Sequence, residues 1–253
     1  MRRARGRPRV LVATPVKNAE EYLGTYFALL ERLSYPADCL SLGFLESDST
    51  DGTYAALERR LPGLQRRYRR AGLWKHDFGA AFPTDEGRWE EGLQPARRAI
   101  IARSRNHLLA HALDDEEWVF WVDVDMIEAP ADLLDRLLAT GKEIVQPHCV
   151  LLPGGPTFDM NGWRDHGRLH LDDFRGGDDL VQLHTVGGTM LLVRADLHRD
   201  GLHFPPVPYG VGHPLSRPGQ GEVETEGLGI LAHDMGYECW GMPNLEVRHR
   251  YPY

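Results

Sequence analysis

Cysteine is scarce in this chain, and its arrangement excludes whole classes of protein. Three cysteines occur among the 253 residues, Cys39, Cys149 and Cys239, and they form no Cys-x-x-Cys pair. An odd number of widely spaced thiols does not fit a disulfide framework. Free thiols are typical of a reducing compartment, so we predict a cytoplasmic protein.

Long apolar runs are also absent. No stretch approaches the roughly 20 apolar residues that a membrane span requires, and the basic N-terminus leads into a strand-like segment instead of a signal-peptide core. The formal net charge of -8 argues against a general nucleic-acid-binding role. We therefore expect no membrane span and no nucleic-acid partner.

What the sequence does contain is an alternation of strand-like apolar runs with helical periods. Predicted strands cover 10–13, 40–45, 118–122, 143–148 and 187–193, and predicted helices cover 18–34, 95–113, 130–140 and 224–235. The first helix is expected to begin at Asn18, with Glu21 completing a capping box. This order is typical of βαβ units. It predicts an α/β fold with a mostly parallel central sheet flanked by helices.

The basic segments and the irregular segments complete the predicted organisation. The arginines within 1–9 predict a flexible basic arm ahead of a single domain over 10–253. Those within 59–70 predict a solvated helix face, with an anionic surface or acceptor as the alternative. Residues 72–94 show no period and are expected to form a surface loop. The long irregular stretch 153–180 is of a kind that is usually functional in a compact domain.

The most informative stretch is the apolar run from Trp118 that ends in Asp123 and Asp125. Side chains alternate along a strand, so these two carboxylates point the same way. Open α/β sheets bind ligands at the carboxyl ends of their strands. Hard oxygen ligands at such an edge suit Mn²⁺ or Mg²⁺ shared with substrate phosphates. A solvated turn after a buried strand is the structural alternative.

A second polar cluster follows the predicted strand 40–45. Glu46 and Asp48 lie in a turn with hydroxyl side chains that leads into a helix, where they can hold a ribose or the edge of a base. Capping of the helix by Ser49, Thr50 or Asp51 is the structural explanation. Capping does not account for Glu46 and Asp48 as well, so both readings stay open.

Further charged residues lie near the predicted aspartate edge. Arg105, with Arg98 two turns earlier, borders the inward stripe of its helix and requires either a carboxylate or a phosphate. Glu224 and Glu226 open the last helix, where the dipole alone can explain them. His249 follows a strand-like segment between two arginines, a setting that suits a group facing a metal or a phosphate.

Together these pieces resemble the nucleotide-sugar-dependent glycosyltransferases of the GT-A fold, and most closely the Anp1/Mnn9/Van1 mannosyltransferase family (glycosyltransferase family 62). The resemblance covers nearly the whole chain from Val10 to His249, in order. It rests on Ala102-Arg103-Ser104-Arg105-Asn106, Trp121-Val122-Asp123-Val124-Asp125, Val186 to Val193, Gly201 to Pro206, Glu224-Thr225-Glu226-Gly227-Leu228-Gly229, Met235-Gly236-Tyr237 and Gly241-Met242-Pro243.

The resemblance implies a Rossmann-like GT-A domain with a nucleotide-binding half over about 10–126 and an acceptor-binding half over about 127–253. It implies Mn²⁺, or Mg²⁺, held by Asp123, Asp125 and His249. The residues that it assigns to the nucleotide-sugar pocket are Thr14, Pro15, Glu46, Asp48, Arg103, Arg105, Gly187, Gly188 and Thr189. The catalytic residues that it assigns are Glu224 or Glu226, together with Asp123.

The implied reaction moves a sugar, first of all mannose from GDP-mannose, to a hydroxyl of a glycan, peptide or small molecule. The cation and Arg105 would neutralise the departing diphosphate. Glu224 or Glu226 would act as general base if configuration inverts, and would stabilise positive charge if it is retained. The alternatives are a UDP-sugar transferase and a non-catalytic nucleotide-sugar-binding partner subunit. A nucleotidyltransferase is disfavoured because Lys17 stands without a glycine-rich phosphate loop.

Overall fold

The computed structural model describes residues 6–79 and 91–251. Its strands are β1 Val10–Val16, β2 Leu40–Glu46, β3 Arg70–Lys75, β4 Trp118–Val122, β5 Met126–Glu128, β6 Ile144–Val150, β7 Val181–Leu183, β8 Met190–Arg194 and β9 Cys239–His249. Its helices are α1 Leu23–Arg32, α2 Thr53–Arg67, α3 Gln94–Ala112, α4 Leu133–Ala139, α5 Ala195–Arg199 and α6 Glu224–Asp234, with short 3-10 turns η1 Ala37–Cys39, η3 Glu91–Leu93 and η4 Leu171–Phe174. In this part of the chain, no helix is long and apolar enough to cross a bilayer.

All the strands join one sheet, in the spatial order β3-β2-β1-β4-β8-β6-β9-β5, with β7 added on β9. The strands β3, β2, β1 and β4 run parallel, and β6 pairs parallel with β9. β8 enters antiparallel between β4 and β6, and β5 and β7 pair antiparallel with β9. The predicted α/β class and its parallel core are confirmed.

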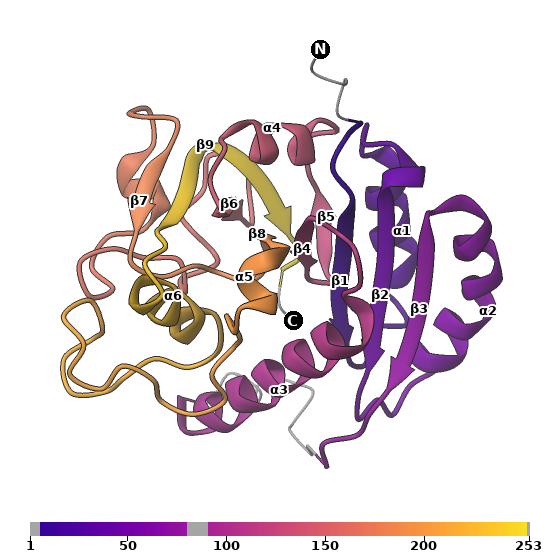
Figure 1. Ribbon diagram of the computed structural model, residues 1–253, viewed down its shortest axis with the longest axis horizontal. Coiled ribbons are helices and arrows are strands. Elements are labelled where there is room, and N and C mark those ends of the chain that lie inside the picture. Colours follow the sequence, from indigo (N-terminus) through magenta and orange to yellow (C-terminus); the bar gives the residue numbers. More distant parts are fainter. Residues whose placement is uncertain (1–5, 80–90, 252–253) are drawn as a thin grey trace.

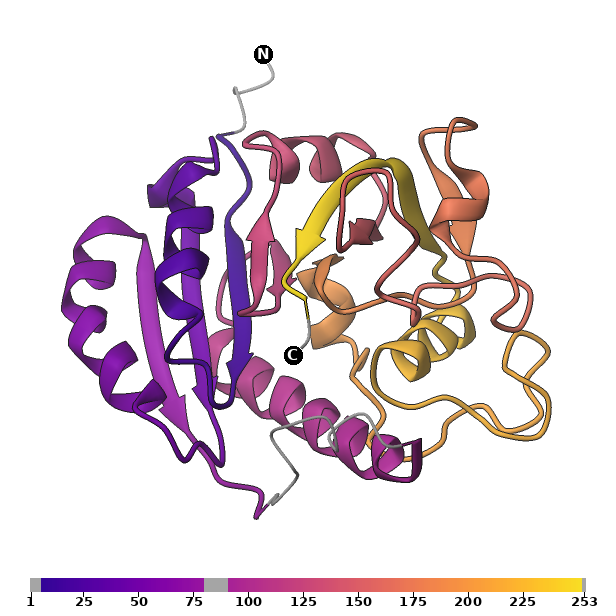
Figure 2. The same ribbon diagram turned by 180° about the vertical axis from the view of Figure 1, so that it is seen from behind.

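Helices cover both faces of the sheet and give the protein two apolar cores (Figures 1 and 2). Along β1, Val10 and Val12 face a core with α1, α2 and α4, whereas Leu11 and Ala13 face a second core with α3, α5 and α6. This alternation explains why both faces of β1 are apolar, because a parallel strand between two helical layers has no solvated side.

Three features of the fold differ from the sequence prediction. β3 lies within and just before the stretch predicted as an irregular loop, and β7 and the short α5 were not predicted. The capping box at Asn18 is wrong: α1 begins after Tyr22 and has no side-chain cap. Asn18 has a left-handed backbone, with φ 46°, and its Oδ1 instead accepts a hydrogen bond from the Thr50 amide. Asn18 thus ties two loops together.

The described end of the predicted basic arm is fixed to the body of the protein. Arg7 pairs with Asp135, and Arg9 pairs with Asp115 at 2.9 Å. The Tyr35 hydroxyl donates to the carbonyl of Pro8 at 2.6 Å. Residues 7–9 thus contact the body of the protein in this structure, and residues 1–5 of that prediction lie outside the described residues.

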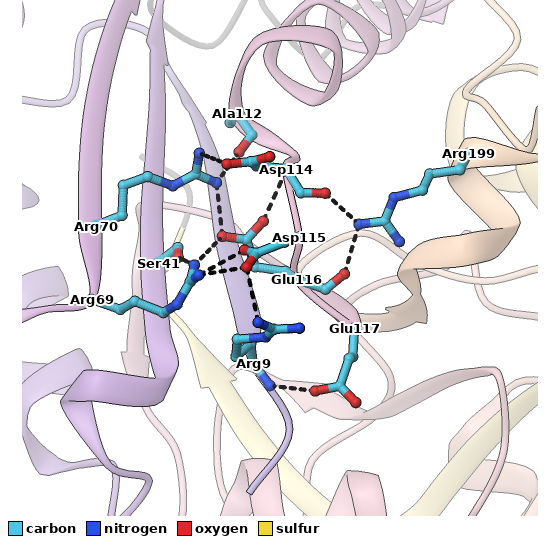
Figure 3. A network of polar contacts seen from close by, with 10 residues as sticks. All are labelled: Arg9, Ser41, Arg69, Arg70, Ala112, Asp114, Asp115, Glu116, Glu117 and Arg199. Carbon is cyan, nitrogen blue, oxygen red and sulfur yellow. Dashed lines mark hydrogen bonds and ion pairs between the residues drawn. The ribbon is translucent and has the colours of Figure 1, made fainter. Parts of the chain in front are cut away.

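A network of ion pairs joins the starts of the parallel strands (Figure 3). Glu116, which precedes β4, has a fully buried side chain whose Oε1 lies 3.2 Å from Arg69 and 2.7 Å from Arg70. Asp115 pairs with Arg69 at 2.7 Å and with Arg9 at 2.9 Å. This amino-edge network therefore links the beginnings of β1, β3 and β4.

Candidate active site

The two aspartates after β4 lie at the opposite, carboxyl edge, and each meets a basic partner. The Asp123 amide donates to the Thr189 carbonyl at 2.9 Å, and its Oδ1 lies 3.0 Å from Nη2 of Arg105. Asp125 Oδ1 lies 3.0 Å from Nε2 of His249. The pairing of β5 with β9, with Met126 opposite His249, brings this histidine to the aspartates from 124 residues away.

His249 is oriented by its other ring nitrogen. Nδ1 lies 2.5 Å from the carbonyl oxygen of Arg250, a contact that requires a proton on Nδ1 and directs Nε2 at Asp125. Burial lowers the pKa of His249, but the hydrogen bond to Asp125 and the charge of that carboxylate outweigh burial and raise the pKa overall. The imidazole thus supplies positive charge, or a nitrogen ligand, to this edge.

Asp123 is the most perturbed carboxyl of the cluster. Its pKa is raised to about 7, chiefly by burial and also by the neighbouring Asp125 and Asp159, against the lowering effects of Arg105 and His249. Full ionisation of Asp123 at neutral pH therefore needs more positive charge than Arg105 and His249 supply. Strong perturbation by burial and named charges is typical of functional sites.

The chemistry of these side chains fits a divalent cation. Within residues 6–79 and 91–251, no three His, Cys, Asp or Glu side chains form a ready metal-binding group. Asp125 and His249 are nevertheless in contact, and the charge of Asp123 is felt by His249. Two carboxylates and an imidazole are suitable ligands for Mn²⁺, and a bound cation would favour the ionised form of Asp123.

Arg105 connects the aspartate edge to the start of α6. Its guanidinium is buried, lies 2.8 Å from Glu224 through Nε and donates from Nη2 to the Gly188 carbonyl at 3.3 Å. Burial opposes its charge, yet Asp123 and Glu224 raise its pKa. Its Nη1 is a buried donor with no hydrogen-bond partner among the described residues. An unused buried donor on a cation suits an anionic ligand.

Glu224 is held in an unusual backbone conformation. It is the first residue of α6 and has φ 61°, a left-handed value that costs free energy for a residue with a Cβ. Its amide donates to the Pro205 carbonyl at 2.9 Å, and its Oε2 accepts from Thr225 at 2.7 Å. Its Oε1 contacts Arg105 as an ion pair but accepts no hydrogen bond from the described residues.

Glu226 has a different environment. Its Oε1 accepts a hydrogen bond from Trp163 Nε1 at 2.7 Å. Its Oε2 lies 2.6 Å from Arg98 and 2.7 Å from Arg217. Both oxygens of Glu226 thus have close partners in the protein that include hydrogen bonds, whereas Oε1 of Glu224 has an ion pair but accepts no hydrogen bond from the described residues.

The paired glycines before β8 serve close packing in this structure. A Cβ on Gly187 would lie 2.1 Å from Asp159, and one on Gly188 would lie 2.5 Å from Arg105. Asp159 Oδ2 accepts from the Thr189 amide at 3.0 Å. These glycines therefore let Asp159 and Arg105 approach the backbone. Asp159 lies in the irregular stretch 153–180, and no periodicity in the sequence pointed to it.

The residues assigned to the nucleoside lie around the ends of β1 and β2, with most of their side chains already engaged. The Thr14 hydroxyl is buried and lies 2.6 Å from that of Tyr26, so its side chain belongs to the core. Pro15 is partly exposed beside it. Glu46 is buried, accepts from the Ser49 amide at 2.9 Å and lies 3.4 Å from Lys75.

Asp48 organises the chain beyond β3. Its backbone has φ 54°, and its carboxylate accepts from the amides of Phe78 and Gly79 at 3.0 and 2.9 Å. Asp77 in turn accepts from the Asp48 amide at 2.8 Å. Asp48 therefore links the β2 turn to the segment that follows β3.

Arg103 lies on a different side of α3 from Arg105. It is exposed, whereas Ser104 and Arg105 are buried. Two residues along a helix are about 200° apart around its axis, so Arg103 projects away from Asp123 while Arg105 projects toward it. The assignment of Arg103 to the nucleotide pocket therefore stays a prediction that its position on α3 does not support.

Comparison with known proteins adds sequence and fold evidence. The family model described as Anp1 matches residues 1–171 and 155–208. The Mannan polymerase II complex anp1 subunit of Schizosaccharomyces pombe is 28% identical over 285 residues, which cover 96% of this chain and 64% of that protein. The ANP1 subunit of the same complex in Saccharomyces cerevisiae is 27% identical over 96% of this chain and 55% of its own length. The chain thus spans less than two thirds of either relative.

Among solved structures, a mannosyltransferase from Pyrobaculum calidifontis in complex with GDP-Man and Mn²⁺ has a TM-score of 0.61. It is 19% identical, and the match covers 98% of this chain and 58% of that one. At this level of identity, the likeness concerns the fold.

Proposed function

This chain belongs to the Anp1 family and has the GT-A fold, and from that premise we propose that it is a metal-dependent glycosyltransferase. The proposed donor is GDP-mannose, and the acceptor is a hydroxyl of a glycan, peptide or small molecule. The observation that carries the proposal is the continuous chain of contacts Asp123–Arg105–Glu224 beside the Asp125–His249 pair.

The chemistry follows from where charge develops. Cleavage of the bond between the anomeric carbon and the diphosphate leaves negative charge on the leaving group. Arg105 carries a buried positive charge and an unused Nη1 donor. Both would stabilise the negative charge on the leaving diphosphate without reorganisation of the site. A divalent cation held by Asp123, Asp125 and His249 would supply further positive charge when bound.

Glu224 is the better candidate for the carboxylate at the reacting carbon. Its Oε1 accepts no hydrogen bond from the described residues, whereas both oxygens of Glu226 are engaged. In an inverting reaction Glu224 would accept the proton of the attacking hydroxyl, and in a retaining one it would stabilise the positive anomeric centre. We assign Glu226 a supporting place instead.

The names of the relatives support mannose as the sugar. Both curated relatives are subunits of a mannan polymerase, and the solved mannosyltransferase was obtained with GDP-Man and Mn²⁺. The word subunit in their names also supports a second candidate, a nucleotide-sugar-binding partner subunit without turnover of its own. The cytoplasmic location stays a prediction.

Calorimetric titration of the protein with GDP, UDP, ADP and dTDP, each with and without Mn²⁺, tests the proposal. We expect GDP to bind with Mn²⁺ and much more weakly without it. Preferential binding of UDP would identify a UDP-sugar transferase, and absence of binding by every nucleotide would overturn the proposal. Release of GDP from GDP-mannose then separates the enzyme from the binding subunit.

A further inference from the structure

Three glutamates at alternate positions lead into α6, and each pairs with arginine. The side chains of Glu222, Glu224 and Glu226 are exposed by 0%, 5% and 2%. Buried carboxylates are tolerated only when they are paired and hydrogen-bonded. Arg105 pairs with Glu224, whereas the two flanking glutamates share a different arginine, Arg217.

Arg217 reaches this segment from the Pro/Gly-rich loop 205–221. Its Nη2 lies 2.5 Å from Glu222 Oε2 and 2.7 Å from Glu226 Oε2, and its amide donates to Glu222 Oε1 at 2.8 Å. The guanidinium also lies 5.7 Å from the centre of the Trp163 ring. The planar fork of arginine is required here, because one group must satisfy two carboxylates at once.

Arg98 completes the arrangement from α3. Its Nη1 lies 2.6 Å from Glu226, and its Nη2 donates to the Val223 carbonyl at 2.5 Å. Arg98 thus contacts residues both before and after Glu224: Val223 through its carbonyl, and Glu226, two residues on, through its carboxylate. These contacts hold the backbone on both sides of Glu224, which has the left-handed conformation.

A second loop braces Arg217 from outside. His166 Nδ1 lies 2.8 Å from the Ser216 carbonyl, and Asp165, His166 and Gly167 all have positive φ, at 52°, 58° and 86°. Such a strained turn persists only where surrounding contacts determine it. The backbone next to Arg217 is therefore held by the 165–167 turn, in addition to the ion pairs of the Arg217 side chain.

We propose that Arg217 is a positioning residue for the transfer reaction: with Arg98, it fixes the start of α6 and thereby holds Glu224 in the strained conformation that presents its carboxylate beside Arg105. This inference rests on the role given to Glu224 in the proposed function. Within the described residues, the polar contacts of the Arg217 side chain are with Glu222 and Glu226, and not with Asp123, Asp125 or His249. Its effect on turnover is therefore separate from any effect on nucleotide binding.

The test compares Arg217→Gln and Arg217→Lys with Arg67→Gln, a matched arginine variant on α2 whose side chain is 48% exposed and pairs with Glu31. Hydrogen exchange of the peptide 222–228 is measured without any ligand. We expect exchange roughly 10-fold faster in Arg217→Gln, a smaller change in Arg217→Lys, and none in Arg67→Gln. Turnover of the nucleotide sugar should fall about 10-fold, while affinity for its nucleoside diphosphate with Mn²⁺ stays within about 2-fold.

Unchanged exchange in Arg217→Gln overturns the inference, as does an equal loss of turnover and nucleotide affinity. If Arg217→Gln does not fold, Arg217→Lys is judged by the same criteria, because it keeps the charge and loses the planar fork. The variant Glu224→Gln distinguishes a failure of the proposed function from a failure of the inference about Arg217. If it retains full turnover, the role of Glu224 in the proposed function fails, whereas an inactive Glu224→Gln with an unaffected Arg217→Gln rejects this inference alone.

Discussion

Two charged clusters lie at opposite edges of the same parallel strands, and they differ in how completely their polar atoms are paired. At the amino edge, Glu116 contacts two arginines, and Arg199 donates to the carbonyls of Asp114 and Glu116 at 2.6 and 2.7 Å (Figure 3). At the carboxyl edge, Arg105 Nη1 and Glu224 Oε1 have no hydrogen-bond partner among the described residues.

The pKa shifts of the two clusters run in opposite directions. Burial acts to raise the pKa of Glu116, but hydrogen bonds from Ser41 and the backbone, together with Arg70, lower it overall. Burial raises the pKa of Asp123 to about 7, and Arg105 does not compensate. A cluster that satisfies its own charges stabilises the fold, whereas one that leaves charge and donors unused is prepared for a ligand.

A hollow of about 490 Å³ adjoins the amino-edge network and is lined by Asp114–Trp118 with three residues of the β8–α5 region. Its size does not make it a reaction site, because its carboxylates already have arginine partners. Buried polar atoms without hydrogen-bond partners therefore indicate the proposed site in this protein better than the volume of a hollow does.

The largest expected effect comes from Asp125→Ala. Loss of this ligand and of its pairing with His249 should reduce Mn²⁺-dependent turnover at least about 10²-fold, since charge stabilisation in the transition state is lost. The matched change at the other edge, Asp115→Ala, should leave turnover within about 2-fold. Release of GDP from GDP-mannose measures both, and full activity of Asp125→Ala, or of the wild type in excess chelator, contradicts metal-assisted transfer.

Glu116→Gln should show the opposite profile, with stability lost and turnover retained. Removing the buried charge from between Arg69 and Arg70 should lower the free energy of unfolding by about 2 kcal/mol at pH 7. Because its pKa is lowered on folding, this stabilisation is present above the unfolded value of about 4.3 and is lost as the pH falls through the folded value. Urea unfolding at several pH values should therefore show the variant and the wild type converging in acid.

A smaller effect of reversed sign is expected for Asp123→Asn. The pKa of Asp123 is raised to about 7 in the folded protein, so its contribution to stability is full at low pH and is lost as the pH rises from about 4 through 7. Without metal, the variant should melt about 2–4 °C above the wild type at pH 8, and the difference should shrink as the pH falls toward about 4. Added Mn²⁺ should stabilise the wild type alone. Equal melting temperatures at pH 8 would show that the carboxyl edge holds no excess negative charge.

The sequence was sufficient to predict those parts of the fold and of the candidate site that depend on a local pattern of residues. The apolar run before Asp123 predicted both the strand and the edge at which it ends, and the helical period of 94–112 placed Arg105 toward the core. β3 was missed because its alternation of charged residues, glycine and apolar residues gives no clear period at the edge of the sheet.

Other parts of the site depend on contacts between distant segments. Glu224 and Glu226 are indistinguishable in sequence, since both open the same helix. What separates them is Arg217, which comes from a loop of no regular period, and Arg98, which comes from another helix. Asp159 likewise gains its place through the amide of Thr189, 30 residues away. Such pairings are set by the tertiary fold and leave no local signal.

The smallest expected effect tests the helix face itself. Arg103→Ala should change neither nucleotide affinity nor turnover by more than about 2-fold, because the residue is exposed and points away from Asp123. Arg105→Ala, two residues on, removes the buried ion pairs to Asp123 and Glu224 and should reduce turnover by about 10²-fold. The same calorimetric and turnover assays serve both variants. A strong loss in Arg103→Ala would mean that the exposed face of α3 binds donor or acceptor, and the contrast between unsatisfied and satisfied charge would then no longer locate the site.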